Sequence, residues 1–338
     1  MTLADLEHFR TLLLEREENL TEWLDSSGSV KAGDARKARS LLGEIKDALG
    51  RVENKTFGEC KVCKGELELH RLEVQPTRQI CLACISKEEQ TELEEELSLA
   101  SKMHRALLPQ AIASIEGFEV AVKSLSARTV GGDYYDFLPA SDGGTTRVII
   151  ADTMGKGIPA GLLMSNIQGA LRVLAEEVES PRLLLTRLNQ WLCRNVPVTK
   201  FMSLACISLE SGSGGNTQLT YSNAGHCPPI LVRNDGSVDR LEPTGGVLGV
   251  HQAFTYEQHD LALSPGDLLV LYTDGITEAE NARSEMFGEE RLIKFVQTYQ
   301  GDSPESFVEK LLGEVRSFSE KPELSDDSTV IALRKVKP

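Results

Sequence analysis

The chain has 338 residues, of which 41% are hydrophobic and 26% charged, and its formal net charge is −15. This length exceeds one typical domain, and the composition excludes disordered and collagen-like proteins. The negative charge argues against direct nucleic-acid binding, because affinity for a phosphate backbone needs clustered Lys and Arg. No run of 18 apolar residues occurs, and the N-terminus is acidic and amphipathic. We therefore expect a cytoplasmic protein without a signal peptide or contact with a membrane.

Residues 1–56 are predicted to form a helical hairpin. Apolar residues recur at helical spacing over 3–24 and 35–53, and the segment DSSGSVKAGD between them has the composition of a turn. Residues 57–87 then contain the spacing C-x2-C-x17-C-x2-C, formed by Cys60, Cys63, Cys81 and Cys84. Four thiolates on two short turns complete a tetrahedron, so we predict one structural Zn²⁺. A redox dithiol or a chance pairing is the alternative.

Three further cysteines, Cys193, Cys206 and Cys227, stand alone in apolar or turn contexts. Burial and a reducing compartment would keep them as thiols. We predict reduced cysteines in or near a core.

The stretch from ALGRVENKTFGEC to RLEVQPTRQICLAC resembles the DksA/TraR zinc-finger family, in which a helical hairpin precedes a four-cysteine finger. Larger members of that family insert the hairpin tip into the secondary channel of RNA polymerase. Each predicted helix here has about 20 residues and spans only about 30 Å. The tip offers Asp25 and Asp34 but no match to the family's acidic tip motif. The resemblance therefore implies the fold and the zinc, and not the polymerase activity.

Residues 88–111 are predicted to form a linker helix that is stopped near Pro109. Its apolar seam alternates steps of four and three, as in a short coiled coil. The seam consists of Leu93, Leu97, Ala100, His104 and Leu107. We interpret this helix as a homodimerising signalling element; the alternative is a connector that packs on its own domain.

After Gly117 the pattern changes to short β-rich runs, with helices predicted near 158–177, 181–195, 289–299 and 304–318. The runs are FEVAVKSL, DYYDFLP, TRVIIADT, FMSLACISLE, TQLTYSNA, PILVRN, FTYEQHDLAL, DLLVLYTDG and DDSTVIALRKV. Strands without regular helical alternation indicate the α+β class, with antiparallel sheets covered by helices. We assign residues 112–338 to one catalytic domain.

Aspartates recur where these runs begin or end. They are Asp133, Asp152, Asp274, Asp326 and Asp327. A single aspartate at a strand end is ordinary turn chemistry, whereas several at converging ends would repel one another and raise their pKa values. A cation removes that cost, and oxygen ligands select Mg²⁺, Mn²⁺ or Ca²⁺ over Zn²⁺. Neighbouring glycines would let the backbone approach the metal. The pattern predicts a two-metal site that clamps a phosphoryl group.

Five ordered motifs resemble the metal-dependent PPM phosphatases, specifically the SpoIIE-type branch of bacterial serine phosphatases that includes RsbU-like regulators. The motifs are GGDYYDF, IADTMGKGIPAGLLM, SNAGHCPPIL, LYTDGITEAEN and DDSTVIAL. The resemblance spans residues 100–338 and implies an α/β/β/α sandwich with two Mn²⁺ or Mg²⁺.

The resemblance also implies a ligand set, carried over position by position. Asp152 would bridge the metals, with the backbone carbonyl of Thr153 beside it. Asp274 and Asp326 would complete one metal, and Asp133 would serve the other. Either Asp326 or Asp327 could occupy the ligand position next to β-rich residues 328–335; Asp326 is preferred as the ligand, and Asp327 is interpreted as a residue that supports the ligands. Asp136 is excluded because it points to the opposite face of the strand from Asp133.

Some positions keep two interpretations. The eukaryotic branch has a proposed general-acid histidine where this sequence has Met154. His226 is a candidate acid, although a role in structuring its turn is favoured. Arg128 and Lys156 are candidate contacts of the substrate phosphate, with exposed loop cations as the alternative.

The family implies hydrolysis of phosphoserine or phosphothreonine without a phosphoenzyme. The implied substrate is a phosphorylated STAS-type anti-sigma-factor antagonist, whose dephosphorylation releases a sigma factor. One alternative is a DksA-like regulator that binds RNA polymerase, with secondary or no phosphatase activity. Another alternative is a zinc finger that only stabilises a small folding unit and has no signalling role.

Overall fold

The structure, a computed structural model, describes residues 3–26, 32–111, 114–139, 145–197, 199–211, 217–299, 303–320 and 324–336. The chain splits into two compact units, Met1–Glu95 and Glu96–Pro338, which are described separately. Helix α4 (Lys87–Leu107) runs across the division. Within the described ranges, no helix is both long and apolar enough to span a bilayer. The domain boundaries at residues 56, 87 and 111 remain predictions.

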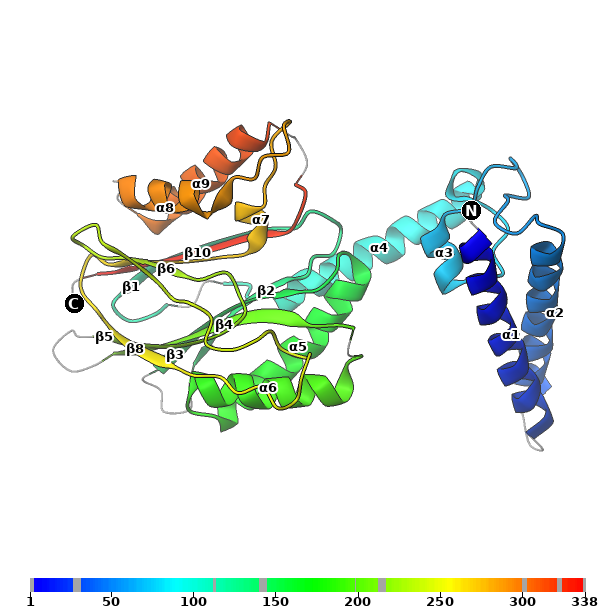
Figure 1. Cartoon of the computed structure of the whole chain (residues 1–338), viewed down its shortest axis with the longest axis horizontal. Coiled ribbons are helices and arrows are strands. Elements are labelled where there is room, and N and C mark those ends of the chain that lie inside the picture. Colours follow the sequence, from blue (N-terminus) through cyan, green and yellow to red (C-terminus); the bar gives the residue numbers. More distant parts are fainter. Residues whose placement is uncertain are drawn as a thin grey trace. The chain divides into compact units, whose positions relative to one another are not determined.

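The first unit contains the predicted hairpin, formed by α1 (Leu3–Ser26) and α2 (Ala32–Glu53) (Figure 1). At 1.5 Å per residue, helices of 24 and 22 residues extend roughly 36 and 33 Å. Residues 27–31 of the predicted turn lie outside the described residues. The hairpin shares one core with the cysteine-rich segment, made of Phe9, Leu13, Ile45, Ala48, Phe57, Leu67 and Leu72.

Two short helices in this unit were not predicted. They are α3 (Leu69–Val74) and the 3₁₀ helix η1 (Leu82–Cys84). Each is only one or two turns long, too short for the helical period to stand out in the sequence. Buried Leu72 ties α3 to the hairpin core.

The second unit is built around two five-stranded sheets, and every described pairing in them is antiparallel. One sheet has the order β1-β10-β9-β6-β7, and its strands are β1 (Phe118–Leu125), β10 (Ser328–Lys335), β9 (Leu268–Tyr272), β6 (Ile230–Val232) and β7 (Val238–Arg240). The other has the order β2-β3-β4-β5-β8, and its strands are β2 (Asp133–Pro139), β3 (Thr145–Thr153), β4 (Met202–Ser211), β5 (Thr217–Ala224) and β8 (His259–Leu263).

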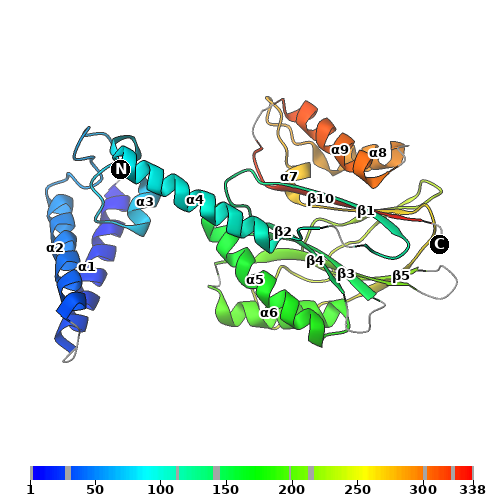
Figure 2. The same ribbon diagram turned by 180° about the vertical axis from the view of Figure 1, so that it is seen from behind.

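Helices cover the outer face of each sheet, so the unit has four layers (Figure 2). Helices α5 (Ile158–Glu177) and α6 (Pro181–Asn195) lie over the β2-β3-β4 side. Helices α8 (Gly288–Thr298) and α9 (Pro304–Ser319) lie over the β1-β10 side. All four helices were predicted within two residues of these bounds. The predicted α/β/β/α sandwich is confirmed.

Three apolar cores hold the layers together, one at each interface between layers. Ile207, Leu271 and Ile331 pack between the sheets. Met164 and Leu188 represent the core beneath α5 and α6, and the core beneath α8 and α9 is centred on side chains such as Phe307. Burial of each such side chain contributes about 1.5–3 kcal/mol. The layer order therefore follows from which face of each element is apolar.

The C-terminal part of α4 packs on the second unit. Ser101 and His104 are buried, and Leu107 and Leu108 contact the core beneath α5 and α6. Gln168 of α5 donates a hydrogen bond to the carbonyl of Leu107 at 3.3 Å. This half of the helix therefore fits the connector interpretation, while dimerisation through the predicted seam remains a prediction.

The predicted strand FTYEQHDLAL begins only at His259. In the preceding segment, Tyr256 is buried in the core beneath α6, and the Glu257 amide donates to the Thr244 carbonyl at 3.2 Å. Side-chain burial thus overrides the β-rich composition there. The short strand β7 was not predicted; it follows the turn in which the Arg233 amide and the Ser237 carbonyl are hydrogen-bonded.

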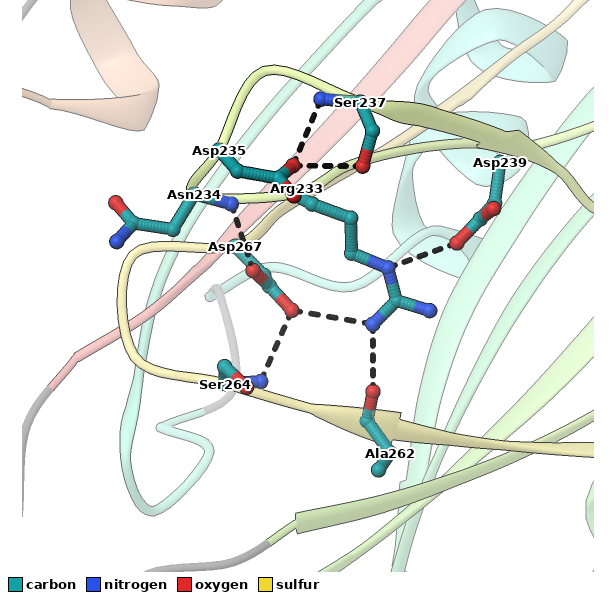
Figure 3. Close-up of polar contacts among 8 residues, drawn as sticks. All are labelled: Arg233, Asn234, Asp235, Ser237, Asp239, Ala262, Ser264 and Asp267. Atoms are coloured by element: carbon teal, nitrogen blue, oxygen red, sulfur yellow. Dashed lines mark hydrogen bonds and ion pairs between the residues drawn. The ribbon is translucent and has the colours of Figure 1, made fainter.

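A polar network joins the two sheets at the end of β9 that precedes Leu268 (Figure 3). Arg233 donates to the Asp267 carboxylate at 3.3 Å and to the carbonyl of Ala262, in the other sheet, at 2.6 Å. Asp267 is 2% exposed and also accepts the backbone N–H groups of Asn234 and Ser264. The buried carboxylate is thus paired and fully hydrogen-bonded, which offsets its desolvation.

Candidate metal centre and cysteine cluster

Four predicted ligands gather at the other end of β9, and we call them the aspartate group. They are Asp133, Asp152, Asp274 and Asp326. Asp133 begins β2 and pairs in register with Asp152 of β3. Asp274 directly follows Thr273 at the end of β9, and Asp326 lies just before β10. Because β9 and β10 are antiparallel neighbours, the end of one and the start of the other share an edge. The expected convergence of strand ends is confirmed, and the role of each aspartate as a ligand remains a prediction.

Asp133 is fixed by two hydroxyl groups from the opposite sheet. The side chain is 5% exposed, and its Oδ2 accepts hydrogen bonds from Thr273 Oγ1 at 2.8 Å and Thr329 Oγ1 at 2.7 Å. The Thr329 amide in turn donates to Thr273 Oγ1 at 2.9 Å. The sequence analysis missed both threonines, although each lies beside or near a singled-out aspartate, in YTDG and DDST.

The carboxyl groups raise one another's pKa. Burial is the main cause and neighbouring carboxylates add to it, bringing the pKa of Asp133 to about 7 and that of Asp152 to about 8. Burial, then Glu278 and Asp326, raises the pKa of Asp274 to about 6. Ionising all of these carboxyl groups together is therefore costly, and a bound cation would offset that cost.

Gly132 allows the backbone to approach Asp152 and Thr153 closely. A Cβ atom at Gly132 would lie 3.0 Å from the Thr153 carbonyl oxygen and 3.3 Å from Asp152 Oδ1. Any larger residue would crowd this carbonyl, the predicted backbone ligand. Glycine was expected beside Asp133 because it lets the backbone approach closely, and Gly132 meets this expectation.

Asp327 binds backbone rather than facing the other aspartates with free oxygens. Its Oδ1 accepts the Ala127 N–H at 2.7 Å, and its Oδ2 accepts the Gly132 N–H at 2.6 Å. Both oxygens are thus engaged in holding the loop before Asp133. This geometry agrees with the interpretation of Asp327 as a supporting residue and leaves Asp326 as the preferred ligand.

Lys156 lies against Asp326 in this structure. Its Nζ is 2.7 Å from Asp326 Oδ2 and donates to the Ser325 carbonyl at 2.9 Å. It is therefore not simply an exposed loop cation. Arg128 is exposed on its loop, and its Cδ lies 3.9 Å from the position of a Cβ at Gly157.

His226 structures its turn. Its amide donates to Asn223 Oδ1 at 2.8 Å, its carbonyl accepts from Asn223 Nδ2 at 3.1 Å, and its Nδ1 lies 2.7 Å from Ser203 Oγ. Burial lowers the pKa of the ring to about 4, so it is neutral at pH 7. Met154, at the position of the family's histidine, is 43% exposed and offers no proton.

Two other sequence interpretations can be compared with the structure. Asp136 accepts hydrogen bonds from the Tyr134 hydroxyl at 2.6 Å and Arg172 Nε at 3.1 Å, away from the aspartate group. Cys193, Cys206 and Cys227 are free thiols, as predicted. Burial, then Asp274 and Asp152, raises the pKa of Cys227 to about 12, which places this thiol near the aspartate group; the sequence analysis did not link them.

The aspartate group has the donors that Mn²⁺ and Mg²⁺ prefer, namely carboxylate and carbonyl oxygens. In the described part of the chain, only the four cysteines have all their ligand atoms within 4.8 Å of one another, so the aspartates are more widely spread. The Thr153 carbonyl, which Gly132 leaves open to approach, and the buried or half-buried carboxylates therefore fit a centre of such cations.

The cysteines Cys60, Cys63, Cys81 and Cys84 form the compact cluster that the spacing predicted. Hydrogen bonding from the Cys81 backbone is the largest cause that lowers the pKa of Cys60 to about 6. Hydrogen bonds with the neighbouring thiols raise the pKa of Cys84 to about 12. Crowded thiols that resist losing all their protons without a cation are compatible with a zinc site.

Comparison with known proteins decides the family. Residues 142–336 match the family model described as stage II sporulation protein E (SpoIIE). The chain belongs to the SpoIIE family. It is 32% identical over 249 residues to the phosphoserine phosphatase RsbU of Bacillus subtilis, covering 73% of this chain and 72% of RsbU. As a SpoIIE-family member it carries a PPM-type serine/threonine phosphatase domain.

Solved structures show the same fold. The SiaA-PP2C domain of Pseudomonas aeruginosa matches with a TM-score of 0.64 and 20% identity, covering 73% of this chain and 98% of that domain. The structure of the RsbU and RsbW domains of Rv1364c from Mycobacterium tuberculosis matches with a TM-score of 0.55 and 27% identity, covering 66% of this chain and 62% of that one.

The DksA/TraR resemblance is also confirmed. The RNA polymerase-binding transcription factor DksA of Buchnera aphidicola is 25% identical over 85 residues, covering 24% of this chain and 56% of DksA. The DksA of Escherichia coli is 34% identical over 56 residues, covering 17% of this chain and 37% of that protein. These relatives are thus matched over only part of their length.

Proposed function

We propose that this SpoIIE-family phosphatase dephosphorylates a STAS-type anti-sigma-factor antagonist and thereby controls a sigma factor. The observation that carries the enzymatic part is the group of buried or half-buried aspartates at one end of the sandwich, with Asp133 fixed by Thr273 and Thr329. The similarity to RsbU, named a phosphoserine phosphatase, supports the substrate class. Such a pathway operates in the cytoplasm.

In this proposal, Asp133, Asp152, Asp274 and Asp326 would hold the two metals, with the Thr153 carbonyl as a further ligand. When bound, Mn²⁺ or Mg²⁺ supplies positive charge at the phosphoryl group and makes water more acidic. The protein contributes rigidity.

Three parts of the chain provide that rigidity. Thr273 and Thr329 orient Asp133 from the opposite sheet. Asp327 fixes the Gly132 loop.

Hydrolysis forms a P–O bond from water and breaks the serine Oγ–P bond. Since Met154 cannot donate a proton to the leaving oxygen, that proton must come from water or from another group.

The N-terminal unit and α4 are proposed to regulate this reaction. The buried His104 of α4 lies against α5, because a Cβ at Gly161 would be 3.3 Å from His104 Cδ2. The same Cβ would be 2.1 Å from Val130 Cγ1, on the loop leading to Asp133. A shift of α4 would therefore displace the loop that contains Val130 and leads to the proposed ligand Asp133. Homodimerisation through the exposed half of α4 would supply such a shift.

The test is release of phosphate from candidate phosphorylated STAS proteins by the full chain, with Mn²⁺ or with EDTA. We expect turnover with Mn²⁺ and none with EDTA. Absence of Mn²⁺-dependent release from every phosphoserine protein and from p-nitrophenyl phosphate would contradict the proposal.

A second candidate function rests on the likeness of the N-terminal region to DksA. If the chain is mainly a regulator that binds RNA polymerase, immobilised polymerase should retain it, and release should follow addition of a DksA competitor. A failed pull-down together with Mn²⁺-dependent phosphate release favours the phosphatase.

A further inference from the structure

A cleft opens beside the proposed metal centre, between the loop after β1, helix α7 (Asp274–Thr277) and helix α9. Its volume is about 580 Å³, within the usual range for ligand sites. The residues that matter for its chemistry are Ser126, Ala127, Gly275, Arg316, Ser319 and Ser325. None of them belongs to the ligand set proposed above.

The cleft adjoins the proposed ligands through the chain itself. Gly275 follows Asp274, and Ser325 precedes Asp326. Ala127 donates its N–H to Asp327, the residue that holds the Gly132 loop. The cleft therefore lies beside the segments that carry Asp274 and Asp326, within reach of residues that flank a bound phosphoserine.

Arg316 places a positive charge in the described lining of the cleft. Arg316 is exposed on α9, and its guanidinium makes no ion pair with any residue in the described ranges. At the other side, the Ser325 carbonyl is bonded to Lys156 Nζ at 2.9 Å. Glu280, which also lines the cleft, already has a partner of its own. An exposed guanidinium in the wall of a cleft can pair with a carboxylate of a bound peptide.

We propose that this cleft receives the substrate segment next to the phosphoserine, and that Arg316 recognises an Asp or Glu side chain in that segment. The inference rests on the proposed phosphatase function and adds a specificity residue to it. Arg316 acts on the flanking sequence and not on the phosphoryl group. Its contribution should therefore depend on the peptide and vanish for a small aryl phosphate.

The experiment measures kcat/KM of the full Mn²⁺-loaded chain on three substrates. Two are phosphoserine peptides that differ only in having Asp or Asn on both sides of the phosphoserine, and the third is p-nitrophenyl phosphate. Arg316→Glu should lower kcat/KM for the Asp peptide about tenfold, because a charge-assisted contact becomes a repulsion. The Asn peptide and p-nitrophenyl phosphate should change less than about twofold. Arg316→Lys should retain most of the preference.

Two further variants distinguish the effect of charge in the cleft from the effect of blocking it. Lys310→Glu makes the same charge change on α9 outside the cleft lining, and should leave all three substrates unaffected. Ser319→Trp should obstruct the cleft, lowering turnover of both peptides but not of p-nitrophenyl phosphate.

Equal losses for Arg316→Glu and Lys310→Glu, or equal losses on both peptides, would overturn the inference. So would wild-type turnover of p-nitrophenyl phosphate with none of either peptide. Absence of all Mn²⁺-dependent turnover would instead refute the phosphatase function on which the inference rests.

Discussion

Asp133 shows how a single carboxylate can be both buried and useful. Thr273 and Thr329 bind one of its oxygens and hold the side chain in place, while burial keeps its pKa near 7. A carboxyl group in this state ionises readily when a cation arrives. The cost of burying it is thus offset only when the centre is loaded, which ties the residue to catalysis rather than to folding.

Asp152→Asn and Asp274→Asn are each expected to abolish Mn²⁺-dependent phosphate release, by at least about 100-fold, while the fold survives. Asparagine keeps the shape but removes the charge that a divalent cation needs. The measurement is hydrolysis of p-nitrophenyl phosphate across a Mn²⁺ titration, with circular dichroism as the check on folding. Full activity in either variant would eliminate the proposed ligand set.

Asp326 and Asp327 are expected to behave differently despite being neighbours. Asp327→Ala leaves two backbone N–H groups unpaired and should cost about 2–4 kcal/mol of unfolding free energy as well as activity. Asp326→Ala removes a side chain that is 31% exposed, so it should lose activity with little loss of stability. Urea unfolding read beside phosphate release separates the two. Equal destabilisation would contradict the assigned division of roles.

The sequence was informative about the aspartates because each lies at one end of an apolar strand, and Asp133 and Asp274 adjoin a glycine. It could not reveal Thr273 and Thr329, since their importance comes from a contact between two sheets that only the folded chain creates. The same holds for the ion pair between Lys156 and Asp326, residues 170 positions apart in the chain. The local sequence pattern predicts which carboxylates matter, whereas their hydrogen-bond and ion-pair partners depend on how the chain folds.

At the scale of elements, the four covering helices were predictable because each has a long apolar face, and α5, α6 and α9 also have a proline in the first turn. Ser180 and Ser303 cap α6 and α9 by accepting the amides of Leu183 and Ser306, respectively. The strand predicted to begin at 254 was wrong over its first five residues because Tyr256 packs into the core beneath α6. Strand edges are decided by tertiary packing more often than helix ends are.

Arg233→Ala is expected to destabilise the catalytic unit without impairing catalysis. It strips the buried Asp267 carboxylate of its cation, which typically costs about 3 kcal/mol or more. Because this network lies at the end of β9 opposite Asp274, kcat should stay within about twofold of wild type. The matched control is Arg283→Ala, whose ion pair is on a 78% exposed side chain and should cost under about 1 kcal/mol. Equal midpoints of urea unfolding for the two variants would argue against the network's role.

The N-terminal unit is expected to hold about one zinc per chain, bound as four thiolates. Cys81→Ser should lose that zinc and unfold the hairpin core that Phe57 and Leu67 share with the finger. Cys193→Ser, in α6, is the control and should keep the metal. Elemental analysis and hydrogen exchange of residues 3–95 provide the readout. A folded finger free of metal would remove the case for a zinc site.

At the scale of the whole molecule, the aspartate group links folding, metal binding and pH. The pKa values of Asp133 and Asp152 are raised to about 7 and about 8, against about 3.9 for aspartate in an unfolded chain. Between about pH 4 and pH 8 the folded chain therefore binds more protons than the unfolded chain. Stability without metal must fall as pH rises through this window. Mn²⁺ binds the deprotonated carboxylates, so its stabilising effect must grow over the same window.

Thermal unfolding of the full chain at pH 5.5 and pH 8, with EDTA or with Mn²⁺, measures this linkage. In EDTA the Tm should be roughly 5 °C or more lower at pH 8, since 1 kcal/mol shifts Tm by about 2–4 °C in a domain of this size. Mn²⁺ should remove most of that difference. Asp152→Asn should flatten the pH dependence in EDTA, whereas Glu309→Gln removes one exposed charge from α9 and should leave it unchanged. A general repulsion among the excess acidic groups would move both variants alike, so only a selective effect of Asp152→Asn attributes the pH dependence to the centre.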